Sequence, residues 1–337
     1  MRPKLNNSGV TAVSAETAIA LYRTMQRIRR VEEAIVERYP EQRMRCPVHL
    51  CIGQEAVAAG ICQALEGRDQ IVSGHRSHGH YLAKGGDLNS MMAEIYGKAT
   101  GCSGGKGGSM HLIDRNAGFL GATPIVGGTI AMAVGAALAA KLRGETRVAV
   151  AFFGDAAVET GIFHESLNFA ATHGLAVLFV CENNLYSVYS PLSVRQPEGR
   201  PIVALARGHG IAADALDGND AEAVHVAARG AIESLRAGDG PVFLEFATYR
   251  WREHCGPNLD NDIGYRAPEE FEAWLRRCPI ATHRVRLLND HRVNEDALGR
   301  LDADIDKEVR DAFAFAEESA FPPAEEMSTE IYASLGR

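Results

Sequence analysis

The sequence lacks any long hydrophobic run. Within its 337 residues, no stretch approaches the roughly 20 apolar residues that a membrane-spanning helix requires. The start of the chain also lacks the continuous apolar core of a secretory signal peptide. We therefore expect a protein that stays in the cytoplasm and has no membrane partner.

Paired cysteine motifs and an excess of positive charge are missing as well. The seven cysteines are an odd number without any C-x-x-C motif, which argues against a disulfide framework and against a zinc cluster. A net charge of −8 gives no electrostatic attraction for nucleic acid. Length and a hydrophobic content of 46% favour one large α/β domain with appended elements.

Helical and strand-like patterns alternate along the chain. The predicted segments are helices at 14–39, 54–65, 128–142, 159–173 and 221–237, strands at 147–153, 176–182 and 241–247, and a charged helical region at 268–333. The strands are apolar throughout, as a parallel sheet covered by helices requires. The helix at 128–142 has almost no charge, so we expect it to be buried on most of its sides.

The region between 71 and 128 is dense in glycine, histidine and serine. A flexible linker could have this composition, but linkers rarely carry several histidines and an arginine beside apolar residues. We predict ordered functional loops here.

Two of the predicted strands end in small, oxygen-bearing residues. Asp155 follows the first strand and Asn184 the second. Such residues often serve only as turns after strands. Within one βαβ unit, however, both side chains lie beyond the carboxyl ends of parallel strands, where ligands bind. A carboxylate, an amide oxygen and a nearby carbonyl suit Mg²⁺, which also takes phosphate oxygens. The pair thus indicates a metal and a diphosphate.

The chain resembles the α subunit of the thiamine diphosphate-dependent decarboxylating component of 2-oxo acid dehydrogenases, of the pyruvate and acetoin type. The matching blocks are HLCIGQEA (49–56), GHRSHGHYLAKGG (74–86), GCSGGKGGSMHL (101–112), PIVGG (124–128), GDA…ENNLY (154–186) and TYRWREH (248–254). The resemblance implies a doubly wound, mostly parallel sheet flanked by helices, with helical extensions at both ends.

The resemblance also implies roles for individual residues. The implied metal ligands are Asp155, Asn184 and the carbonyl of Tyr186, and the implied cofactor-binding residues are His75, Arg76, Ile125, Val126, Gly154, Asp155, Ala156, Ala157, Asn184 and Arg250. Arg76 and Arg250 would hold the diphosphate through charge-assisted bonds. Ile125 and Val126 would bend thiamine diphosphate into its reactive shape.

Three histidines are predicted to be catalytic. His254 and His49 match residues at the active-site loop and the substrate entrance, and His78 matches one that orders the phosphate loop. An imidazole can donate a hydrogen bond to a substrate carboxylate or carry a proton. A structural role is predicted for the other four histidines considered, His80, His111, His164 and His173.

The sequence departs from the family pattern at several positions. Ala156 replaces the second glycine of Gly-Asp-Gly, and its methyl group is tolerable only at negative φ. His75 stands where pyruvate-type members have tyrosine, and Arg252-Glu253 replaces a His-Gly pair in the later loop. The glutamate that activates the cofactor belongs to another chain in the family. A transketolase-like β subunit, in a complex of two α and two β chains, is therefore the expected partner.

Three functions are compatible with these residues. The first is decarboxylation of a 2-oxo acid with transfer to a lipoyl acceptor on an acyltransferase. The second is a carboligase that joins the activated aldehyde to a carbonyl acceptor such as a keto-sugar, as the altered loop suggests. The third is a non-catalytic scaffold or regulatory chain. A nucleotide-binding loop in GCSGGKGGS is disfavoured, because Gly107 follows Lys106 where a P-loop needs Ser or Thr.

Three parts of the chain follow from these patterns. We expect an N-terminal helical segment at 1–45, a thiamine diphosphate-binding α/β domain at 46–267 and a C-terminal helical extension at 268–337.

Overall fold

A computed structural model of the chain describes residues 13–329. Its helices are α1 (Ala15–Arg38), α2 (Glu55–Ala64), α3 (His78–Ala83), α4 (Leu88–Ile95), α5 (Gly128–Leu142), α6 (Gly161–His173), α7 (Leu192–Arg195), α8 (Ile202–Gly208), α9 (Ala221–Ala237), α10 (Pro268–Leu275), α11 (Pro279–Asn289) and α12 (Glu295–Glu318). The strands are β1 (Gln70–Ser73), β2 (Phe119–Ala122), β3 (Ala149–Gly154), β4 (Val177–Asn183), β5 (Tyr186–Ser187), β6 (Ser190–Pro191), β7 (Ala212–Asp217) and β8 (Val242–Ala247).

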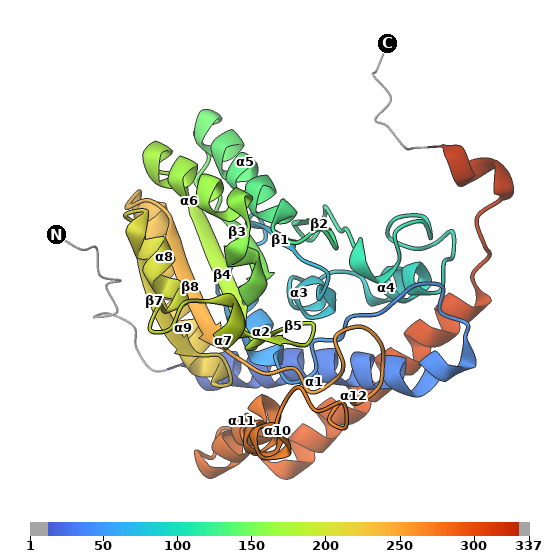
Figure 1. The fold of residues 1–337 in the computed structure, drawn as a ribbon. Helices are drawn as coiled ribbons and strands as arrows, with labels where there is room; N and C mark the ends of the chain where they lie inside the picture. Colours follow the sequence, from blue (N-terminus) through green and yellow to red (C-terminus); the bar gives the residue numbers. More distant parts are fainter. Residues whose placement is uncertain (1–12, 330–337) are drawn as a thin grey trace.

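Within residues 13–329, a parallel sheet of six strands in the order β2-β1-β3-β4-β8-β7 forms the centre (Figure 1). The chain passes from β1 outward to β2 on one side and continues through β3 and β4 on the other. This reversal places a switch point beside β1 and β3, where the loops after the strands diverge. Ligands of doubly wound sheets bind at such points.

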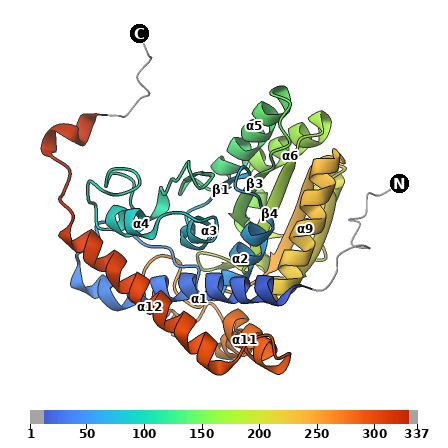
Figure 2. The ribbon, with the colours of Figure 1, turned by 180° about the vertical axis from the view of Figure 1, so that it is seen from behind.

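Both faces of the sheet are buried. Successive strand residues point to opposite faces, and helices cover each face. In β3, Val150 and Phe152 pack into the core under α2 and α9, whereas Ala151 and Phe153 pack into the core under α5, α6 and α8. β4 continues the alternation with Val180 and Cys181. The result is a three-layer structure with helices on both faces of the sheet (Figures 1 and 2).

The two helical extensions pack against each other, although they lie far apart in the sequence. Helix α1 begins at the N-cap Ser14, whose side chain accepts a hydrogen bond from the Thr17 amide. Helix α12 lies beside it (Figure 2), and the hydroxyl of Tyr22 donates to Asp302 at 3.1 Å. The N-terminal and C-terminal helical extensions therefore pack together as one helical layer.

The fold class predicted from the sequence is confirmed, and most predicted segments are present within a few residues. Helix α5 begins and ends at the predicted residues. The expectation that it is buried on most sides is wrong. One stripe containing Ile130, Ala133 and Ala137 packs on the sheet, while Met132 on another side is 47% exposed.

The predicted division of the chain at residues 45 and 267 stays a prediction, and its ends at 1–12 and 330–337 lie outside the described residues. No helix among the described residues is long and apolar enough to cross a membrane.

Candidate active site

The carboxyl ends of β1, β3 and β4 open into a cavity of about 310 Å³. This volume lies at the lower end of the range of about 300–1,000 Å³ that is usual for small-molecule sites. Most of the predicted site residues line it: His49, His75, Arg76, Val126, Gly154, Asp155, Ala156, Ala157, Asn184, Tyr186 and His254. Three predicted residues, His78, Ile125 and Arg250, do not line it.

Asp155 and Asn184 lie at the same edge of the sheet because β3 and β4 are paired in register, with Gly154 opposite Glu182. The Asn184 side-chain amide donates to the Gln54 side-chain oxygen at 3.0 Å, which leaves the Asn184 oxygen as the acceptor. Burial raises the pKa of Asp155, while Arg195 and the Asn184 backbone N–H oppose the rise. The side chains of Asp155 and Asn184 thus lie together in the cavity lining.

The backbone around Tyr186 is forced into an uncommon conformation. Leu185 and Val188 have left-handed φ angles of 72° and 54°, which cost free energy for residues with branched side chains. The Tyr186 amide hydrogen bonds to the Asn184 side-chain oxygen at 3.3 Å. Ala156 lies in the short 3₁₀ turn at Asp155–Glu159 and is not among the described residues with positive φ. Its methyl group therefore causes no backbone strain.

The Asp155 carboxylate forms an ion pair with an arginine side chain. Arg195, from the short helix α7, forms a close ion pair with Asp155 through Nη2. Its Nη1 lies 2.5 Å from Glu159 Oε1, and its Nε donates to the Ser190 carbonyl at 3.2 Å. The side chain is only 10% exposed. Nothing in the sequence patterns singled out Arg195, because the loop that carries it has no regular period.

Arg76 is a partly buried cation in the cavity lining. Its guanidinium donates to the carbonyls of Leu50 at 2.6 Å and His254 at 3.2 Å. Among the described residues it forms no ion pair with a carboxylate within 4.0 Å. Burial and the nearby Arg250 lower the pKa of Arg76 to about 10. A partly buried guanidinium that contacts carbonyl oxygens but no carboxylate is well suited to an anionic ligand.

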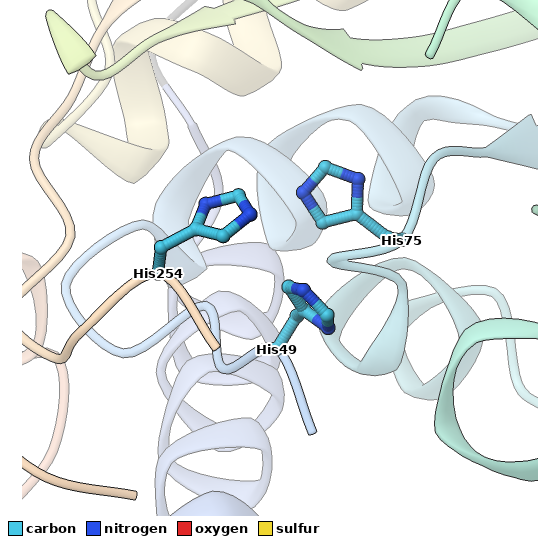
Figure 3. A group of neighbouring side chains, drawn as sticks. All are labelled: His49, His75 and His254. Carbon is cyan, nitrogen blue, oxygen red and sulfur yellow. The ribbon is translucent and has the colours of Figure 1, made fainter. Parts of the chain in front are cut away.

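Three imidazoles meet at the cavity wall. His49 comes from the segment before α2, His75 follows β1, and His254 lies in the loop after β8 (Figure 3). Burial, followed by the charge of Arg76, lowers the pKa of His49 to about 3, of His75 to about 2 and of His254 to about 4. All three are therefore neutral at neutral pH.

His78 has the surroundings of a positioning residue. It is fully buried, its Nδ1 lies 3.0 Å from Glu32 Oε1 and its Nε2 lies 2.7 Å from the Ser109 hydroxyl. Glu32 also accepts the Cys51 backbone N–H. Its predicted catalytic role stays a prediction, but these bonds tie α1 to the glycine-rich loop and leave neither nitrogen for a substrate.

The remaining predicted residues lie near the cavity without lining it. Ile125 is 70% exposed beside Val126. Arg250 is buried; it donates to the Arg252 carbonyl in its own loop and to the Val188 carbonyl between β5 and β6, and it lies 3.3 Å from Asp260. Arg252 and Glu253, the residues that depart from the family pattern, also bond within this loop and are not part of the cavity lining.

Sequence reasoning missed a polar relay inside the cavity. The Ser73 hydroxyl lies 2.8 Å from His80 Nδ1, and His80 Nε2 lies 3.3 Å from Glu182. All three residues line the cavity and are buried. The structural role predicted for His80 is consistent with this packing between β1 and β4. A signal for Glu182 was available, since it directly precedes the Asn-Asn pair.

The protein has a doubly wound α/β fold. Its cavity lies at the switch point of the parallel sheet, where proteins with this fold bind small molecules. Comparison with known proteins specifies the family. The family model for the dehydrogenase E1 component matches residues 23–325.

Several named relatives span almost the whole chain. The α subunit of acetoin:2,6-dichlorophenolindophenol oxidoreductase from Bacillus subtilis is 39% identical, and the match covers 96% of each chain. The pyruvate dehydrogenase E1 component α subunit of Rhizobium meliloti is 36% identical over 96% of this chain and 92% of its own. The human mitochondrial somatic form is 33% identical over 96% and 82%.

The chain belongs to the dehydrogenase E1 component family. The family prediction is thereby confirmed, as is the predicted class of enzyme, a thiamine diphosphate-dependent 2-oxo acid dehydrogenase component.

Proposed function

We propose that this chain is the α subunit of an enzyme that decarboxylates a 2-oxo acid and transfers the resulting acyl group to a lipoyl acceptor. The observation that carries the proposal is the convergence of Asp155, Asn184, Tyr186 and Arg76 on one cavity at the switch point of the sheet. The relatives named above for pyruvate and acetoin support small substrates of this kind.

The oxygen donors at one side of the cavity fit a magnesium ion. In this proposal Asp155 would supply a carboxylate, Asn184 an amide oxygen oriented by Gln54, and Tyr186 a backbone carbonyl. Mg²⁺ binds few protein oxygens and completes its shell with water and phosphate. The Arg195 guanidinium and the ion would compete for Asp155, so binding requires Arg195 to move or to share the carboxylate.

The part of the cavity lining around Arg76 fits the diphosphate of thiamine diphosphate. The partly buried Arg76 guanidinium contacts neutral carbonyls, so an anionic ligand would neutralise its positive charge. Gly154, Ala156 and Ala157 present little side-chain bulk along the lining. When bound, thiamine diphosphate supplies the carbon nucleophile and the electron sink for decarboxylation.

The chain's own residues can orient the substrate. His49 and His254 are neutral and face the cavity, so each can donate one N–H to the carboxylate of a 2-oxo acid. Arg76 adds positive charge beside them. His78 fixes the loop that carries Arg76, because its two nitrogens bond to Glu32 and Ser109.

A β-type subunit completes the site in this proposal. Helix α5 and the preceding loop expose Ile125, Val126 and Met132 by between 46% and 70%, and Val126 lines the cavity. Exposed apolar residues that cluster beside a site commonly mark a protein contact. We propose two α and two β chains, together with a separate lipoyl acyltransferase that receives the acyl group.

Coexpression with the β chain tests the function directly. Calorimetry with thiamine diphosphate and Mg²⁺ should show binding to the complex, and pyruvate, branched-chain 2-oxo acids and acetoin should be assayed with dichlorophenolindophenol as electron acceptor. We expect dye reduction with at least one 2-oxo acid and its loss in Asp155→Asn. Cofactor binding without dye reduction would favour a carboligase, to be assayed by product formation with a keto-sugar acceptor. No cofactor binding would identify a scaffold.

A further inference from the structure

Three imidazoles from separate parts of the chain form a compact group at the cavity. His49, His75 and His254 have ring centroids 4.7, 5.1 and 5.4 Å apart, and each pair meets edge to face (Figure 3). One ring nitrogen from each residue lies within 4.8 Å of the other two. The figure shows all three rings turned toward a common centre.

The ring nitrogens of these three histidines form few hydrogen bonds with the rest of the described chain. His49 is 7% exposed, and its buried Nδ1 has no hydrogen-bond partner among residues 13–329. His75 forms no hydrogen bond with other described residues, and His254 Nδ1 lies 3.5 Å from Arg76 Nη2, at the limit of hydrogen bonding. An unsatisfied buried nitrogen is costly, so native proteins seldom leave one without a function. His78, with both nitrogens bonded, shows the usual arrangement.

The protonation state of the group also suits a metal. Burial and Arg76 lower the pKa of each imidazole well below neutral pH, so protons do not compete for the nitrogens there. Neutral imidazole is a ligand for zinc, copper, nickel and cobalt and a poor one for magnesium. The group therefore differs chemically from the oxygen donors at Asp155 and Asn184.

We propose that His49, His75 and His254 bind a divalent transition-metal ion, of which Zn²⁺ is the best match. Three imidazoles with a fourth position open to the cavity form a common zinc coordination set. Bonds of the usual length would bring the ligand nitrogens to about 3.3 Å from one another. The present spacing, within 4.8 Å, would have to shorten by up to about 1.5 Å on binding, through rotation of the side chains.

Arg76 limits the affinity of this site. Its guanidinium would lie roughly 5 Å from the ion, and at an effective dielectric constant of about 20 this repulsion weakens binding by roughly 10⁴- to 10⁵-fold. We therefore expect micromolar affinity, and removal of the ion by a chelator. Because the ion would lie in the cavity, Zn²⁺ at such concentrations should reversibly inhibit whatever reaction occurs there. The site does not depend on the proposed function.

Cobalt titration of the purified full-length chain tests the proposal. Co²⁺ reports tetrahedral imidazole coordination by its visible absorption, and Zn²⁺ binding is measured by calorimetry. We expect one ion per chain, at least 100-fold weaker binding in His75→Phe, and roughly 10⁴-fold tighter binding in Arg76→Gln, where the repulsion is gone. The matched control is His164→Gln, which removes a pair formed with His209 outside this group at 3.2 Å. It should leave the spectrum unchanged.

Three results would overturn the proposal: a cobalt spectrum that survives His75→Phe, one that disappears in His164→Gln, or no Zn²⁺ binding up to 100 times the expected micromolar range. Should the His75→Phe chain fail to fold, chemical footprinting of the unaltered chain replaces it. Zn²⁺ should protect His75 and His254 from diethyl pyrocarbonate, while the exposed His111 and His291 remain reactive. Equal reactivity with and without Zn²⁺ at His75 would also reject the site.

Discussion

Replacement of Arg195 by glutamine tests how the predicted metal ligand Asp155 is held. The two side chains are 10% and 2% exposed, so this ion pair is largely shielded from water. Removal of one partner from a buried pair costs about 3–5 kcal/mol, because the other charge stays buried without compensation. Taking the lower value, since Glu159 and the backbone share part of the interaction, we expect a loss of about 3 kcal/mol in stability.

The same change should strengthen metal binding. In the unaltered chain, an ion at Asp155 must first displace Arg195, and this cost is absent in Arg195→Gln. If the full 3 kcal/mol were recovered, the affinity would rise by about 150-fold. Because Arg195 can keep its bonds to Glu159 and Ser190, we expect a gain of about tenfold to 100-fold in affinity.

Calorimetry of the αβ complex with Mg²⁺ and thiamine diphosphate measures the affinity, and thermal unfolding with and without Mg²⁺ measures the stability. The midpoint of the variant should fall by roughly 5 °C without the ion, and recover most of this loss with it. Arg200→Gln is the control, because Arg200 is exposed and bonds to the Gln196 side chain in the same loop. Weaker or unchanged ion binding in Arg195→Gln would refute the competition between Arg195 and the ion.

Three further changes probe the surroundings of the cavity. Gln54→Leu removes the acceptor that orients the Asn184 amide. Cofactor affinity measured by calorimetry should therefore fall about 10- to 100-fold with little change in fold. An unchanged affinity would contradict this role of Gln54. His78→Phe leaves Glu32 buried without its imidazole partner. The urea midpoint should therefore drop by an amount equivalent to about 3 kcal/mol of stability. If His78 only positions the loop, KM for the 2-oxo acid should change less than threefold. The lowered pKa of His75, about 2, means that the unfolded chain takes up a proton below pH 6.5 and the folded chain does not. Stability is therefore lost as pH falls, and between pH 6 and 5 the unaltered chain should lose about 1 kcal/mol more than His75→Phe in urea unfolding; parallel pH profiles would show that this histidine is not shielded.

The fold could be predicted largely from local patterns. Continuous apolar runs such as 176–182 can be stable only when both faces are covered, and alternation of such runs with helices leads to a parallel sheet. The ends of α5 and α9 follow from glycine and charge at their boundaries, which are local signals. Strand β7 is as long as β3 and β8, but its sequence is only weakly apolar, so it is recognised only through its pairing with β8.

The candidate site divides in the same way. Asp155 and Asn184 could be placed together from the amino-acid sequence, because both directly follow strands and the carboxyl ends of parallel strands share one edge. Arg195 could not, since its contact with Asp155 spans 40 positions and depends on the path of a loop without periodicity. The same reason explains why Arg250, predicted to face the cofactor, is turned toward Asp260.

The class of fold, the family and the polar side chains that follow two strand ends all depend on local order along the chain, so the amino-acid sequence was enough to predict them. Which side chains meet depended on tertiary packing. That packing brought His49, His75 and His254 together from three distant segments, and it placed Arg195 on Asp155. Such contacts arise from the way loops pack over the sheet, which is a property of the whole folded chain.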